Sequence, residues 1–383
     1  EMKIDPEDLY AYSRAYQSPI FTNYHDITIL DPTAGGGSIP FEAARLGCKV
    51  IANDLNPVAS AIEIATVQYP AQYGKELIPF LENYGERLAQ TVSDKTEELY
   101  HFAKPDEAGR KSLLTQCGGS KSLFAKFDVP EYDQQGLLYC RTVICPHCGE
   151  RAPLLNAFAL SKKKDGWMVV PEVYGDSGSK KVRFKPVRLT NGKGPHGEDP
   201  EKGTVKNGVG TCLHCGQAIS SEEIKLQARG ESKYGVWKDE LYCIVSVREQ
   251  PKLDKHGNVA TYTSGTQKGQ VKAERCITFR EPTQADFDAL KRADQALQDN
   301  WSRWEEMDLI PTERFPVGND MRPVIYGMTR WCDMYTSRQL VGLLTAMETL
   351  HDMTSEIIKD TGAEKGRAII HYLQYMIDKC VDY

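Results

Sequence analysis

Four cysteines occur as two CxxC motifs, each followed by glycine, and this is the pattern of a metal site. They are Cys145, Cys148, Cys212 and Cys215. Two such motifs can place four thiolates tetrahedrally around Zn²⁺, and a site closed by four cysteines is structural rather than catalytic. His147 and His214 lie at the same position within the two motifs, and we expect both to point away from the metal. Free thiols or a redox CxxC motif are the weaker alternatives, because the motif is paired.

A glycine-rich turn, Asp31–Gly37 (DPTAGGG), is the second group of residues that could do chemistry. Its three consecutive glycines let the backbone approach a ligand without interference from a Cβ atom, and the amides at the start of a following helix favour a carboxylate or a phosphate. The turn is neither a GK[ST] phosphate loop nor a GxGxxG motif. Asp54 follows Asp31 by 23 residues and is placed to accept hydrogen bonds from an adenosine ribose. The alternative is an ordinary turn in which Asp54 caps a helix.

The segments around this turn predict the order strand, turn, helix, strand. Asp26–Leu30 is expected to be a short strand, Ser38–Gly47 a helix that ends at its glycine, and Cys48–Ala52 a second strand. Asn56 and Pro57 then begin another helix as its cap and first residue. This order is typical of one βαβ unit, so the sequence predicts the α/β class with a doubly wound parallel sheet.

Two segments, Asp31–Ser38 (DPTAGGGS) and Asn53–Pro57 (NDLNP), resemble motifs I and II of amino-directed DNA methyltransferases. The resemblance is closest to the adenine-specific DNA methylases that carry a zinc ribbon, and Tyr139–Gly149 and Trp331–Leu340 share it. It implies a Rossmann-like methyltransferase sheet whose turn holds the methionine end of S-adenosylmethionine, while the acid of motif II binds the ribose. The cofactor-binding residues that it implies are Asp31, Pro32, Ala34, Gly35, Gly36, Gly37, Asp54 and Leu55. The family most often has Phe where this chain has Thr33.

The middle of the chain, from Glu131 to Pro282, is rich in glycine, lysine and β-branched residues. Strands are expected at Leu241–Val247, Val259–Thr263 and Cys276–Arg280, with Asp176–Gly210 as a long polar loop or an edge hairpin. The two CxxC motifs are 63 residues apart, more than a zinc ribbon usually has, so we expect an insertion. The stretch Lys180–Lys193 within it has six basic residues and no acid. For this stretch we weigh DNA contact equally against a solvated surface.

These patterns predict three parts. Residues 1–130 form the cofactor-binding part of the methyltransferase domain, residues 131–282 form a β-rich zinc-ribbon insertion that meets DNA, and residues 283–383 form a helical segment that returns to the first domain. Amphipathic helices are expected over Lys75–Tyr100 and Thr283–Glu306, with a capping box at Thr336 and Gln339 before a further helix.

The composition is that of an ordinary globular protein, with a net charge of −6, 40% hydrophobic residues and 26% charged residues. An acidic balance argues against a surface that binds polyanions throughout but does not exclude a local basic patch. No apolar run approaches the roughly 18 residues of a membrane-spanning helix, so no membrane partner is expected. Eleven cysteines with four in paired motifs favour a reducing compartment, and we expect a cytoplasmic protein.

The expected function is transfer of a methyl group from S-adenosylmethionine to N6 of a flipped adenine in double-stranded DNA. The [DNS]PP[YFW] motif that holds the base in amino methyltransferases does not occur in the sequence, so no residue is assigned a catalytic role. The motif is expected either to follow Tyr383 in a longer protein, which the family's motif order favours, or to be missing from a non-catalytic zinc-ribbon DNA-binding subunit with a relic cofactor pocket. A dinucleotide oxidoreductase is a third alternative. An RNA substrate and partner subunits of a modification or defence system stay open.

Overall fold

The contacts within the chain divide it into two compact units. The computed structural model describes residues 24–100, 134–161, 165–176, 178–265, 268–316, 318 and 322–381. Unit 1 comprises Glu1–Lys95 and Gly342–Tyr383, and unit 2 comprises Thr96–Val341. The last helices of the chain therefore belong with its first elements, as the predicted return of residues 283–383 required. The division falls near residue 341, however, and not near 282, so the first helix of that predicted segment belongs to unit 2.

Unit 1 begins with a parallel strand pair. Its elements are β1 (Thr28–Asp31), α2 (Ser38–Arg45), β2 (Lys49–Ala52) and α3 (Pro57–Glu63). The two strands pair in parallel from Thr28 opposite Lys49 to Asp31 opposite Ala52, so the predicted order of strand, turn, helix and strand is confirmed. No further strand joins this pair in the described part of the chain, and the larger Rossmann-like sheet therefore stays a prediction.

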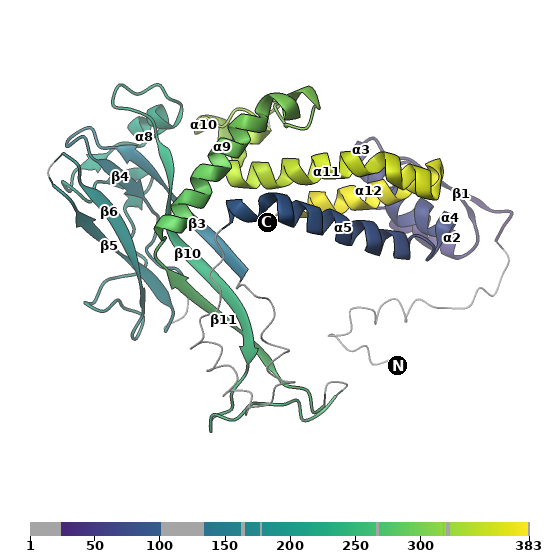
Figure 1. The fold of residues 1–383 in the computed structure, drawn as a ribbon, viewed down its shortest axis with the longest axis horizontal. Helices are drawn as coiled ribbons and strands as arrows, with labels where there is room; N and C mark the ends of the chain where they lie inside the picture. The colour runs from purple at the N-terminus through teal and green to yellow at the C-terminus, as the bar shows by residue number, and fades with distance from the viewer. Residues whose placement is uncertain are drawn as a thin grey trace. The chain divides into compact units, whose positions relative to one another are not determined.

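Helices supply the core of unit 1 (Figure 1). They are α4 (Tyr69–Tyr73), α5 (Ile78–Thr96), α11 (Ser337–Thr361), of which all but the first turns lie in this unit, and α12 (Ala363–Cys380). Helix α5 is shorter than the predicted Lys75–Tyr100 and ends in a 3₁₀ turn. Its Leu88 packs with Ile357 and Ile369 of the later helices, all at most 1% exposed, because apolar residues recur at helical spacing on each facing side.

Unit 2 is built from antiparallel strands. A four-stranded sheet has the order β11 (Ala273–Arg280), β10 (Lys238–Pro251), β3 (Gln134–Ile144), β4 (Arg151–Leu154). A hairpin pairs β5 (Trp167–Tyr174) with β6 (Lys181–Arg188), and a small sheet has the order β7 (Val205–Lys206), β8 (Val209–Thr211), β9 (Ala218–Ile219). The hairpin alternative for Asp176–Gly210 is therefore right, at least over β6. The predicted strand Val259–Thr263 is wrong as a strand, because only isolated bridges form there.

Three of the described helices of unit 2 begin at side-chain caps. The helices of this unit are α8 (Ser221–Ala228), α9 (Gln284–Glu306), α10 (Arg322–Ile325) and the first turns of α11. The capped ones are α8, α9 and α11. The predicted capping box is confirmed, because the Thr336 amide donates to Gln339 Oε1 at 3.0 Å and the Gln339 amide donates to Thr336 Oγ1 at 3.4 Å. Just before it, the Asp333 carboxylate accepts bonds from the side chain and amide of Arg330. The segment Trp331–Leu340 thus has a structural role as the start of α11. No helix in the described ranges is long and apolar enough to cross a membrane.

Candidate metal centre and cofactor turn

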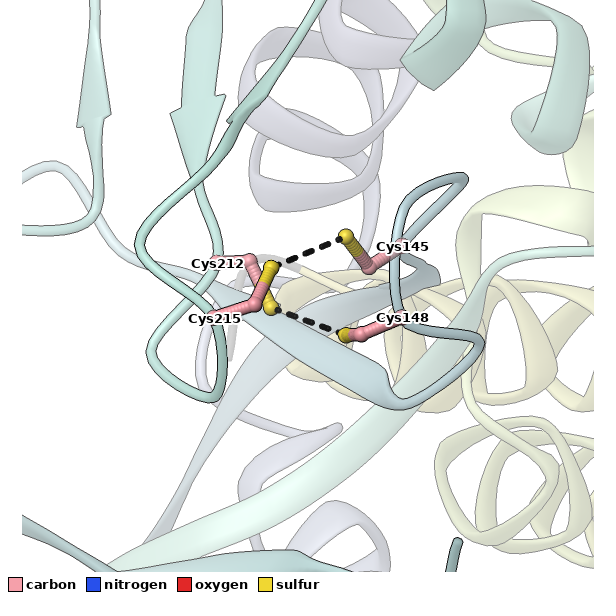
Figure 2. Close-up of side chains that lie close together, drawn as sticks. All are labelled: Cys145, Cys148, Cys212 and Cys215. Carbon is pink, nitrogen blue, oxygen red and sulfur yellow. Dashed lines mark hydrogen bonds between the residues drawn. The ribbon is translucent and has the colours of Figure 1, made fainter.

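The four cysteines of the CxxC motifs come together in unit 2 as predicted (Figure 2). Cys145 and Cys148 lie in the turn between β3 and β4, and Cys212 and Cys215 lie in the turn between β8 and β9. The Sγ atoms of Cys145 and Cys215 are 3.7 Å apart, as are those of Cys148 and Cys212. All four sulfurs lie within 4.8 Å of one another, so the cluster could hold a metal ion such as zinc.

The two turns have the same backbone geometry. In the first, the Cys145 amide donates to the Glu150 carbonyl at 2.9 Å, and in the second the Cys212 amide donates to the Gln217 carbonyl at 3.0 Å. The glycine after each second cysteine, Gly149 or Gly216, has a φ of 76°, in the left-handed region that a side chain disfavours. The glycine in each motif is therefore required by the turn, which aims both cysteines of a pair at one point.

Burial and backbone amides act in opposite directions on these thiols. Burial raises the pKa of Cys212 to about 12, whereas an amide hydrogen bond from Gln217 lowers the pKa of Cys215. A buried thiolate is costly in the absence of a cation, and a bound metal ion that replaces the thiol protons offsets that cost. Cys145 and Cys212 are at most 1% exposed, so four-cysteine coordination leaves no open position for a substrate.

His147 and His214 are not ligands of the cluster, but neither points simply outward as we expected. Nε2 of His147 lies 3.2 Å from the carbonyl oxygen of Ala218, where β9 begins, and Nε2 of His214 lies 3.0 Å from that of Arg151, where β4 begins. Each ring therefore donates to the strand that leaves the opposite turn. The reciprocal pair ties the two hairpins together beside the metal position, which explains why both motifs carry histidine at the same place.

Two of the remaining cysteines, Cys140 and Cys243, are buried in unit 2. Burial raises the pKa of Cys140 and of Cys243 to about 12, so both are inert thiols in the core of unit 2. Cys117 lies outside the described residues.

The glycine turn in unit 1 lies at the carboxyl end of β1, as predicted. Gly35 and Gly37 have φ values of 57° and 80°, and Gly37 is the residue before the first turn of α2. The Ala34 amide donates to the Asn53 carbonyl at 3.0 Å, which joins the turn to the end of β2. The Gly36 amide has no partner among the described residues, and the first amides of α2 have none within the helix. Amides without partners at the start of a helix are the groups that commonly bind anions.

Asp54, which follows β2, holds this turn by a hydrogen bond. Its Oδ2 accepts from the Gly35 amide and its Oδ1 from the Asn56 amide, each at 2.8 Å. The Asn56 and Gly35 amides lower the pKa of Asp54, so the group is ionised at neutral pH. The helix cap is a different residue, because the Asn56 side chain accepts from the Val58 amide at 3.0 Å. The alternative in which Asp54 caps α3 is therefore wrong. Leu55, also predicted to bind cofactor, is 97% exposed.

Glu63, at the end of α3, is a candidate site residue that the sequence analysis missed. It is only 7% exposed, and its Oε1 has no hydrogen-bond partner among the described residues. Its Cγ lies 3.3 Å from the position that a Cβ on Gly37 would occupy, so a buried carboxylate stands directly behind the start of α2. A π-helical turn, Ile64–Gln68, follows it, and such turns are frequent at functional sites. The signal available in the sequence was one acid within the apolar run AIEIA.

The basic stretch Lys180–Lys193 has less free charge than the sequence suggested. Arg183 and Lys185 of β6 both pair with Glu172 of β5, at 2.6 Å and 3.2 Å. The Arg188 guanidinium lies 4.5 Å from the centre of the Trp167 ring. Three of the six basic residues thus have partners within the hairpin, and Lys193 lies 3.8 Å from Asp199.

Comparison with known proteins adds nothing to this geometry. No family model matches the chain, and no match was found among curated proteins or solved structures. The residues and their arrangement alone support a function.

Proposed function

We propose that the chain is the cofactor-binding and DNA-positioning part of an S-adenosylmethionine-dependent DNA methyltransferase specific for adenine N6, with a structural zinc ribbon. The observation that carries the proposal is the pair of bonds from the Gly35 and Asn56 amides to Asp54. They hold a charged carboxylate at the ends of two parallel strands, beside a turn with free amides. This arrangement supports a ligand with a ribose at one end and an anionic group at the other.

The residues present fit both ends of S-adenosylmethionine. The Gly36 amide and the first turn of α2 would bind the carboxylate of its methionine part. The buried Glu63 carboxylate, which has an oxygen without a partner, would accept a hydrogen bond from the ammonium group. Asp54 would keep its two amide bonds and use its remaining lone pairs for the ribose hydroxyls. When bound, the cofactor supplies an electrophilic methyl group, and the chain's part is to fix its position.

The adenine target and the DNA substrate come from the family resemblance. The proposal gives no residue of this chain a catalytic role, because the residues that would hold the flipped base do not occur in its sequence.

Calorimetric titration with S-adenosylmethionine tests the proposal. We expect the chain to bind, and Asp54→Asn to weaken binding at least tenfold, whereas the exposed control Asp26→Asn leaves it unchanged. Tighter binding of NADH than of S-adenosylmethionine would favour an oxidoreductase instead. Transfer of a labelled methyl group to DNA adenine by the native protein, lost in Asp54→Asn, separates the enzyme from a non-catalytic subunit with a relic pocket. A chain that binds no S-adenosylmethionine refutes both the methyltransferase and the non-catalytic subunit with a relic cofactor pocket.

A further inference from the structure

The central sheet of unit 2 continues into a two-stranded arm. Among the described residues, which resume at Gln134, β3 pairs with β10 as far as Val247, whereas β10 and β11 stay paired to Pro251 and Ala273. Figure 1 shows the two strands running on past the end of β3. We call residues 248–276 the arm and its described residues 252–265 and 268–272 the tip.

Hydrogen bonds make the tip a defined structure. The Lys252 amide donates to the Lys272 carbonyl at 2.8 Å, the Lys272 amide donates to the Ala260 carbonyl at 2.9 Å, and the Ala260 amide donates to the Lys252 carbonyl at 2.8 Å. These three bonds bring together segments that are distant in sequence and place Lys252 beside Lys272. At the outer turn, Asp254 Oδ1 accepts from the amides of His256 and Asn258 at 2.8 Å and 2.9 Å.

The tip is basic on a chain that is acidic overall. It contains four lysines, one histidine and a single acid, Asp254, within a chain of net charge −6. The lysines are Lys252, Lys255, Lys268 and Lys272. The first three are exposed, and none of the four forms an ion pair with any described residue. The Lys272 ammonium lies 5.2 Å from the centre of the Tyr262 ring.

We propose that the arm contacts the sugar–phosphate backbone of duplex DNA through its tip lysines. The inference rests on DNA being the partner in the proposed function. The paired strands β10 and β11 form a two-stranded ribbon of the kind that fits the major groove, which is roughly 12 Å wide. The lysines of the three-segment tip beyond it then meet phosphates on the groove edges. Exposed ammonium groups that lack acidic partners are the groups that release counterions when they bind DNA. An anionic membrane is the less suitable partner, because no large apolar side chain is exposed among the described tip residues.

The tip and the β5–β6 hairpin differ in the way their charge is held. In the hairpin, Arg183 and Lys185 share Glu172, so contact with a phosphate must first break an ion pair. In the tip, Asp254 bonds to backbone amides, which lower its pKa and leave the lysines without an acidic partner. The arm is therefore a better DNA contact than Lys180–Lys193, for which the sequence analysis weighed DNA contact equally against a solvated surface.

Salt-dependent binding of a labelled duplex tests the arm against the hairpin. The arm variant is Lys252→Gln with Lys255→Gln and Lys268→Gln, and the matched control is Lys181→Gln with Arg183→Gln and Lys185→Gln. Three lost phosphate contacts should flatten the slope of log K against log salt by about 2.7 in the arm variant, since each contact contributes about 0.9. The control should flatten it by less than about 1.

Zinc content and melting temperature measured on the same samples show that both variants are folded. Three outcomes overturn the inference: an unchanged slope in the arm variant, an equal loss in the control, or no binding of DNA by the wild type. Binding of the wild type to phosphatidylserine vesicles in place of DNA also overturns it. S-adenosylmethionine binding by the same samples is independent of the arm, so failure of this inference is distinguishable from failure of the proposed function.

Discussion

Replacement of Glu63 by Gln tests the predicted role of the buried carboxylate behind the glycine turn. Glu63 is 7% exposed and its Oε1 is unpaired in the described structure. A hydrogen bond to a charged partner contributes about 1.5–3 kcal/mol. The amide keeps an acceptor but loses the charge, so we take the lower half of that range. It corresponds to roughly 10- to 40-fold weaker binding of S-adenosylmethionine.

The assay compares S-adenosylmethionine with a ligand that lacks its amino-acid part and its sulfonium charge. Methylthioadenosine has the adenosine part but no ammonium or carboxylate, so its affinity should stay within about twofold in Glu63→Gln. The control variant is Glu42→Gln, an exposed acid on α2 that pairs with Arg45. The melting temperature of Glu63→Gln should not fall, because Oε1 makes no hydrogen bond that could be lost. Unchanged binding of S-adenosylmethionine, or an equal loss for both ligands, would refute the assignment of Glu63 to the ammonium group.

Two further predictions concern unit 2. Cys212→Ser, or treatment with a strong chelator, should remove bound zinc and lower the melting temperature. The control variant Cys380→Ser, at an exposed cysteine outside the cluster, should retain the metal. Wild-type protein that contains no zinc would contradict the metal site. Burial raises the pKa of Asp286, but bonds from Arg280 and Thr283 outweigh it and lower the pKa to about 2. A carboxyl whose pKa is lower in the folded state than its unfolded value of 3.8 stabilises the fold at any pH above that value. Asp286 therefore contributes about 2 kcal/mol to the free energy of unfolding at neutral pH. This contribution is lost as the pH falls from about 4 to 2. Denaturant unfolding of Asp286→Asn should show this loss of stability at pH 7 and a weaker fall of the unfolding free energy between pH 4 and 2. A fall as steep as that of the wild type would contradict the prediction.

The sequence predicted the parts of the fold that local signals specify. The strand before Asp31, the cap at Asn56 and the box at Thr336 depend on residues a few positions apart, and all three form. The cysteine cluster was predictable for a different reason. Metal chemistry requires four ligands at one point, and that requirement holds whatever fold connects them.

Features that depend on distant pairing were missed. The charge of β6 is held by Glu172, and nothing in the sequence near Arg183 indicates which strand lies beside it. Lys252 and Lys272 are 20 residues apart and form one basic tip only because the arm returns on itself. Glu63 is recognisable as a site residue only once Gly37 is seen to pack against its Cγ.

The joining of the two cysteine turns also affects how the segment between them can grow or shrink in evolution. A metal ion bound by all four cysteines would close the 63 residues between the motifs into a loop, with the β5–β6 hairpin inside it. The entropic free-energy cost of closing a loop rises by only about 0.6 kcal/mol for each doubling of the loop's length. The growth from a ribbon of about 15 intervening residues to this one therefore costs about 1.2 kcal/mol, against some 10–16 kcal/mol from structural zinc. A metal cross-link of this kind lets the loop gain or lose whole hairpins while the two cysteine turns at its ends stay together.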